Sequence, residues 1–139
     1  MDKNLAGTLI EKAIEQLQFS YAPYSNFKVG AALLAKNGTI YGGCNIENAS
    51  YSPTNCAERT AFFKAVSEGI KEFEAICVVG GEDGILTGYA SPCGVCRQVM
   101  MEFCDPGTFQ IILATSKEQY EIFTLEEILP LGFGQKNLT

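Results

Sequence analysis

The 139-residue chain contains no histidine. This absence excludes Ser-His-Asp and Cys-His catalysis within one chain, and it also excludes zinc sites that are built on imidazole ligands. Any metal ion must therefore be held by cysteine, aspartate or glutamate. Any proton must be moved by a carboxylate, a lysine, a tyrosine or a cysteine.

The sequence also lacks long runs of one chemical kind. No stretch approaches about 18 apolar residues, which predicts no membrane span, and no block of about five or six like charges forms a basic arm or an acidic tail. Residues 1–7 lack the charged segment followed by an apolar segment that is typical of a signal peptide, so we expect a cytoplasmic protein. The formal net charge of −6 argues against binding to nucleic acid, which needs clustered lysine and arginine, and it favours a small neutral substrate.

The composition, with 47% apolar and 19% charged residues, is typical of a globular protein, and the length predicts a single domain over residues 1–139. Apolar residues at helical spacing alternate with short apolar runs, two of which flank the hairpin signal Asn37-Gly38. The expected helices cover residues 3–18, 56–68, 93–103 and 125–129, and the expected strands cover 27–35, 39–46, 75–81, 109–114 and 119–123. This alternation predicts an α/β fold, a three-layer α-β-α sandwich around a mixed, roughly five-stranded central sheet.

Three of the six cysteines are candidate metal ligands. Cys93 and Cys96 lie three residues apart at the expected start of a helix, where both sulfurs can bind one ion and where the helix dipole favours the thiolate. A C-x-x-C pair alone is also compatible with a redox dithiol or with coincidence. Cys56 opens another expected helix and supplies a third thiolate. Three thiolates leave the fourth position of a tetrahedral zinc ion open, as in catalytic sites.

The other cysteines fit this ion less well. Cys104 lies eight residues beyond Cys96, which is about 12 Å along a straight helix. Cys77 lies inside an apolar strand, where a buried structural thiol is expected. Cys44 remains an alternative fourth ligand that would close the site. Zinc is favoured because it suits thiolate ligands in tetrahedral geometry, whereas iron–sulfur clusters normally need four cysteines.

A carboxylate and two arginines accompany the cysteines. Glu58 follows Cys56 by two residues, and a carboxylate beside water that zinc activates can serve as a proton shuttle. The alternative is that Glu58 only interacts with the helix dipole. Three thiolates and Zn²⁺ sum to one negative charge, which Arg59 and Arg97 could offset by hydrogen bonding to the ligand sulfurs. The alternative is that both arginines are surface charges.

Four segments, residues 27–33, 45–51, 56–59 and 91–98, resemble the motifs of the compact, homotetrameric, three-cysteine type of cytidine deaminase. The resemblance spans nearly the whole chain, from Tyr21 to Pro130. The general zinc deaminase signature is H-x-E followed by P-C-x-x-C, and Cys56 takes the place of the histidine here. The resemblance implies hydrolytic deamination of cytidine and deoxycytidine to uridine and deoxyuridine plus ammonia, in pyrimidine nucleoside salvage.

The resemblance also implies roles for individual residues. One Zn²⁺ per subunit is held by Cys56, Cys93 and Cys96, and Glu58 moves protons from the water to ring nitrogen N3 and to the departing ammonia. The active sites lie at subunit interfaces of a homotetramer. The implied substrate-binding residues are Phe27, Asn45, Glu47, Tyr51, Ala57, Ser91 and Phe133, and the implied support of the ligands comes from Arg59, Arg97 and Gln98.

Within this substrate-binding set, the backbone around Ala57 and Ser91 would contact the base and Phe27 would pack against its ring. Asn45 and Glu47 would hold the ribose, and residues two apart on a strand do point to one face. Tyr51 and Phe133 would come from neighbouring subunits. Without the resemblance, Phe27 would be interpreted as a core residue, Glu47 as a solvated carboxylate and Phe133 as C-terminal packing.

Two other classes of function remain open. A non-catalytic zinc-binding module would have a fourth protein ligand and would not need Glu58. A deaminase of another cytosine-bearing substrate, either nucleic acid or a nucleoside antibiotic, would use the same chemistry, although the acidic balance disfavours a nucleic-acid strand.

Overall fold

Five strands form one mixed sheet in the order β2-β1-β3-β4-β5. The computed structural model describes residues 1–139. The strands are β1 Phe27–Ala35, β2 Ile40–Cys44, β3 Phe73–Glu82, β4 Gln110–Ala114 and β5 Tyr120–Thr124. Only β3 and β4 pair in parallel, and the other neighbours are antiparallel. The expected mixed five-stranded sheet is confirmed.

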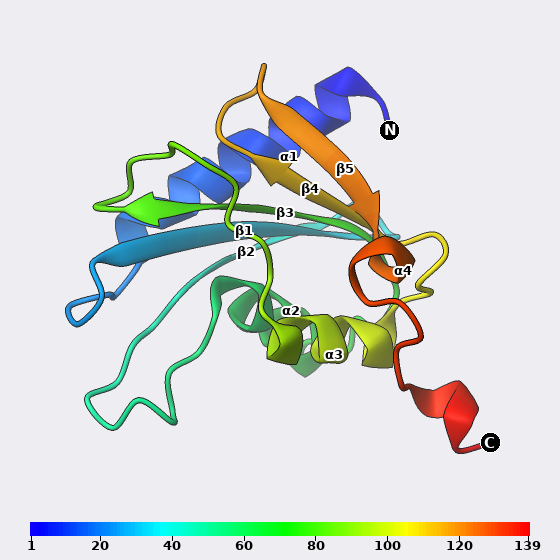
Figure 1. Cartoon of the computed structure of the whole chain (residues 1–139). Helices are drawn as coiled ribbons and strands as arrows, with labels where there is room; N and C mark the ends of the chain where they lie inside the picture. The colour runs from blue at the N-terminus through cyan, green and yellow to red at the C-terminus, as the bar shows by residue number, and fades with distance from the viewer.

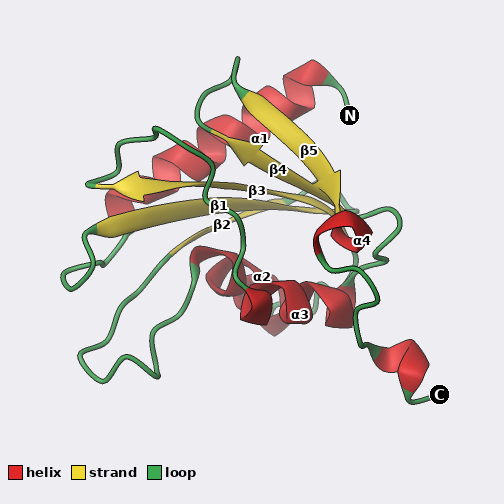
Figure 2. Ribbon diagram, in the orientation of Figure 1, coloured by secondary structure: helices red, strands yellow, loops and turns green.

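Helices cover both faces of the sheet and complete three layers, as Figures 1 and 2 show. They are α1 Lys3–Gln16, α2 Ala57–Ser67, α3 Gly94–Phe103 and α4 Leu125–Ile128, with short 3₁₀ turns at Leu17–Phe19 and Gln135–Asn137. One cluster of buried apolar side chains joins α1 to the sheet, and a larger cluster joins the opposite face to α2 and α3. The predicted α-β-α sandwich is therefore confirmed. None of the helices combines the length and the apolar character that spanning a bilayer requires.

The helix α1 shows why the sequence folds this way locally. The Asp2 side chain caps it by accepting a hydrogen bond from the amide of Asn4 at 2.6 Å. Its buried residues recur at helical spacing and face the sheet. The α-helix ends at Gln16, two residues before the expected end, because the chain tightens into a 3₁₀ turn.

The β1–β2 hairpin turns at Asn37-Gly38, where Gly38 has φ +92°, as the turn signal predicted. The strand β2 ends at Cys44, two residues earlier than expected. Beyond it, Ile46 forms isolated bridges with Tyr21 and Asn55 instead of continuing the ladder.

A glycine on β2 brings the start of α2 close to the sheet. A Cβ atom on Gly43 would lie 2.4 Å from the carbonyl oxygen of Ala57 and 2.7 Å from the amide nitrogen of Ala61. Only glycine permits this approach without displacing the backbone of α2. The first turn of α2, which carries Glu58, is thus fixed against the sheet.

Candidate active site

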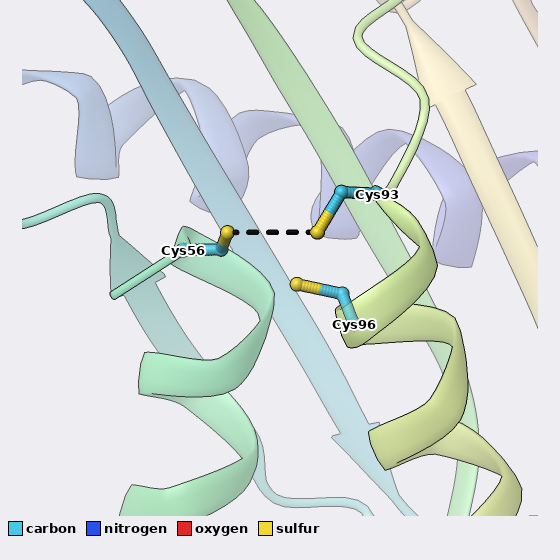
Figure 3. Close-up of side chains that lie close together, drawn as sticks. All are labelled: Cys56, Cys93 and Cys96. Carbon is cyan, nitrogen blue, oxygen red and sulfur yellow. Dashed lines mark hydrogen bonds between the residues drawn. The ribbon is translucent and has the colours of Figure 1, made fainter. Parts of the chain in front are cut away.

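Three cysteine sulfurs gather where α2 and α3 begin. Cys56 is the N-cap of α2, Cys93 is the N-cap of α3, and Cys96 lies in the first turn of α3. Their sulfurs lie within 4.8 Å of one another and point toward a common centre, as Figure 3 shows. The sulfurs of Cys56 and Cys93 are 3.9 Å apart, and tetrahedral zinc with bonds of about 2.3 Å would place two sulfurs about 3.8 Å apart.

The cluster contains no fourth cysteine. Cys44, Cys77 and Cys104 are buried elsewhere, and no other residue joins the three sulfurs as a possible ligand in the structure. Burial raises the pKa of Cys77 to about 12, which fits the expected inert thiol. The alternative in which Cys44 closes the site finds no support in this geometry.

The electrostatics of the cluster favour a cation. The neighbouring Cys96 thiol, together with the Arg59 guanidinium, lowers the pKa of Cys56 to about 5. The pKa of Cys96 is raised, because Cys56 lies beside it and because the residue is buried. Like charges so close cannot all form unless a positive charge joins them. A divalent ion supplies that charge, so the donor set fits zinc.

Arg59 lies beside the sulfurs. Its Nη2 donates a hydrogen bond to Cys56 Sγ at 3.1 Å, and its Nε is buried without any partner. A half-buried guanidinium that lies against sulfur in this way is stabilised if the sulfur carries negative charge. The expected hydrogen bond from Arg59 to a ligand sulfur is therefore present.

Glu58 is buried on the first turn of α2, with only 4% of its surface exposed. Burial raises the pKa of Glu58 to about 7, and the nearby Cys56 acts in the same direction. A carboxyl group with a pKa near neutrality can both accept and release a proton at the pH of the cell. Glu58 also lines the cavity that opens beside the sulfurs.

The cavity beside the cluster has a volume of about 380 Å³ and contains several of the expected residues. That size lies within the usual range for small-molecule sites. Besides Cys56, Cys93 and Glu58, its walls include four of the residues that the resemblance implied: Phe27, Asn45, Ala57 and Ser91. The remaining lining residues are Val29, Thr54, Asn55, Val78 and Ala90. These five were not predicted as site residues, because neither their types nor their spacing marks them as more than core or loop residues.

A second cavity of about 310 Å³ adjoins the first, since Thr54 lines both. Glu47 and Tyr51 line this second cavity together with Tyr24 and Ser25. Phe133 lines neither cavity, and its carbonyl oxygen accepts a hydrogen bond from Gln98 Nε2 at 2.9 Å. The structure of one chain thus brings together all of the expected substrate-binding residues except Phe133.

Asn45 and Glu47 do not lie two apart on a strand as predicted, because β2 ends at Cys44. The Asn45 amide is held by the backbone of β1: its Oδ1 accepts from Val29 N at 3.0 Å, and its Nδ2 donates to Phe27 O at 2.7 Å. The two side chains line different cavities, so they do not share one strand face.

The Glu47 carboxylate is held by the turn that follows the first helix. Its Oε1 accepts hydrogen bonds from the amides of Tyr24 at 3.0 Å and Ser25 at 3.1 Å, and its Oε2 accepts from Ser25 Oγ. These contacts hold the pKa of Glu47 below its usual range, and the hydrogen bond from the Ser25 hydroxyl has the largest effect. The residues of this turn were predicted only to break the helix, and no local signal links them to a carboxylate 22 residues away.

Arg97 differs from its expected role. Its guanidinium donates to Pro92 O at 2.7 Å, to Ser91 Oγ at 2.8 Å and to Ile128 O, and it makes no hydrogen bond to a ligand sulfur. The reason is that residue 97 lies one position beyond Cys96, on a side of α3 where carbonyl and hydroxyl oxygens are the nearest acceptors.

The three-sulfur cluster, the buried carboxylate and the α-β-α sandwich together define a zinc-dependent deaminase domain. The model of the family described as cytidine and deoxycytidylate deaminase zinc-binding region matches residues 3–112. This match includes all three cysteines and Glu58.

Similar proteins narrow this class further. The chain is 53% identical over 129 residues to a cytidine deaminase of Sporosarcina psychrophila. The aligned region covers 93% of this chain and 89% of that protein. The chain is 45% identical over 138 residues to the cytidine deaminase of Halalkalibacterium halodurans, with 99% and 98% covered. The crystal structure of cytidine deaminase from Burkholderia pseudomallei superimposes with a TM-score of 0.82 at 46% identity, covering 91% of this chain and 97% of that one. The chain therefore belongs to the cytidine deaminase family.

Proposed function

We propose that the protein converts cytidine and deoxycytidine, with water, to uridine and deoxyuridine and ammonia. The observation that carries this proposal is the buried Glu58 carboxylate, which shares one cavity with the sulfur cluster. A hydrolytic deamination needs an activated water and a group that carries protons to and from the base. Both requirements can be met at this single point in the cavity.

The chain's own residues divide the work as follows. Cys56, Cys93 and Cys96 would hold one Zn²⁺ per chain, and the bound ion would supply the ionisation of water at neutral pH. Glu58 would accept a proton from the attacking water and deliver it to ring nitrogen N3 of the base. Glu58 then helps to protonate the amino group as the bond between C4 and nitrogen breaks. Arg59 stabilises the thiolate of Cys56 through the hydrogen bond at 3.1 Å.

The cytosine ring occupies the 380 Å³ cavity, where Phe27 packs against it and the backbone around Ala57 and Ser91 contacts its polar edge. The ribose extends toward the adjoining cavity, past Asn45 and Glu47. Because its pKa is low, Glu47 stays ionised at neutral pH and can accept a hydrogen bond from a ribose hydroxyl.

The substrate class can be tested by assaying cytidine, deoxycytidine and a cytosine-containing oligonucleotide side by side. We expect turnover of both nucleosides and little or none of the oligonucleotide, because the net charge of −6 opposes a phosphate backbone. Loss of the amino group can be followed by absorbance, with zinc measured on the same sample. Faster turnover of the oligonucleotide, or of a cytosine-bearing antibiotic, would contradict the proposed substrate class.

We further propose that the enzyme is a homotetramer whose subunit interfaces enclose each site, with Phe133 coming from a neighbouring subunit and Tyr51 lying at the interface beside the cavity of its own chain. Large exposed aromatic side chains support this, since 71% of Tyr51 and 56% of Phe133 lie on the surface. We expect light scattering to give a mass near four times 15.1 kDa. A fully active species with the mass of one chain would contradict this assembly.

All six cysteines are unpaired, which supports a reducing, cytoplasmic location.

A further inference from the structure

We propose that Arg97 is a positioning residue that ties residues 91–93 to the C-terminal part of the chain, and so holds one cavity wall and one zinc ligand in place. This inference rests on the proposed function. Arg97 was expected to contact the ligand sulfurs, but it donates its hydrogen bonds to oxygen atoms instead.

The guanidinium of Arg97 uses all three of its nitrogens. Nε donates to Pro92 O at 2.7 Å, Nη2 donates to Ser91 Oγ at 2.8 Å, and Nη1 donates to Ile128 O. The first two acceptors precede α3, and the third is 31 residues further along the chain, in α4. A planar fork of donors fixes the relative position of three acceptors, which a flexible ammonium cannot do.

The charge of Arg97 is not explained by its helix. Arg97 lies within the first turns of α3, where a positive charge opposes the helix dipole, and that first turn contains no acidic residue. The one ion pair of the structure, Lys117 with Glu11, is elsewhere. The gain from placing a guanidinium here therefore comes from the oxygen atoms that it holds.

The segment that Arg97 holds packs against the core through Tyr89, Ala90 and Pro92, but it makes few other hydrogen bonds. Residues 86–93 form no helix or strand, and Pro92 has no amide hydrogen through which it could be anchored. Ser91 lines the cavity, and the exposed Cys93 supplies the sulfur 3.9 Å from that of Cys56. A shift of this segment would therefore change both the wall of the cavity and the geometry of the sulfur cluster.

The test compares the zinc-loaded and cobalt-loaded full-length variants Arg97→Met and Arg97→Lys with the wild type. At saturating zinc we expect Arg97→Met to lower kcat/KM for cytidine by ~10–100-fold, mainly through a higher KM. We also expect the sulfur-to-cobalt charge-transfer band of Arg97→Met to shift, and Arg97→Lys to restore part of both properties. The matched control is Lys64→Met, which removes a cation-to-carbonyl hydrogen bond of 2.5 Å to Gly42 O outside the cavity and should leave both properties unchanged.

An unchanged kcat/KM together with an unchanged cobalt band in Arg97→Met would overturn the proposal, even if the unfolding temperature falls. If Arg97→Met does not fold, the same two measurements on Arg97→Lys and Ser91→Ala decide, and wild-type values in both would overturn it. If the wild type itself does not deaminate cytidine, the proposed function fails. The cobalt band would then still show whether Arg97 positions Cys93.

Discussion

Replacing Glu58 by glutamine is expected to lower the rate of cytidine deamination by at least ~10²-fold while zinc stays bound. Glutamine keeps the size of the side chain but cannot accept the proton of the attacking water. Because Glu58 is not one of the metal ligands and glutamine fills the same buried space, the change should leave the metal site intact. The measurements are kcat for cytidine and the molar ratio of zinc to protein.

The matched control is Glu68→Gln, which makes the same substitution on an exposed residue at the other end of α2. It should keep wild-type activity. Near-normal activity of Glu58→Gln would remove Glu58 from the mechanism. A wild type that carries zinc but does not turn over cytidine would instead favour the non-catalytic zinc-binding module.

Replacing Cys96 by serine is expected to remove stoichiometric zinc and to lower deamination by at least ~10³-fold. Bound zinc would lower the pKa of water to about 7, so its loss would remove nearly all hydroxide at neutral pH. Cys96 is buried in the first turn of α3 and supplies one of only three sulfurs. Chelation of zinc from the wild type should give the same loss, and added zinc should reverse it in the wild type alone.

The control for this substitution is Cys44→Ala. Cys44 is also buried, but it lies outside the sulfur cluster. We expect this variant to keep one zinc per chain and wild-type kcat. Loss of zinc from Cys44→Ala, or an active enzyme that contains no metal, would contradict the three-sulfur site.

Local sequence patterns predicted the elements of the fold but not all of their ends. The apolar run 27–35 matches β1 in full, because its end is marked by the Asn37-Gly38 turn. The strand β2 ends at Cys44, two residues before the predicted end. Ile46 leaves the sheet because it pairs with Asn55 and Tyr21, and pairing between distant segments leaves no mark in a local window.

Residue type and spacing predicted the sulfur cluster well, because few kinds of side chain bind zinc and because their positions at the starts of helices can be predicted from the sequence. The walls of the cavity were less predictable. Val29 and Val78 line it, yet both look like ordinary strand residues. The direction of the Arg97 side chain could not be predicted either, because one of its acceptors is a carbonyl 31 residues away in the sequence.

The position of the sulfurs at the starts of two helices has a further consequence. Cys56 and Cys93 are 37 residues apart, and the whole of the central strand β3 lies between them. An ion shared by these residues would act as a cross-link that closes this loop and lowers the entropy of the unfolded chain, much as a disulfide does. Metal occupancy and resistance to unfolding would then be thermodynamically linked, so a chain short of zinc would lose rigidity as well as chemistry.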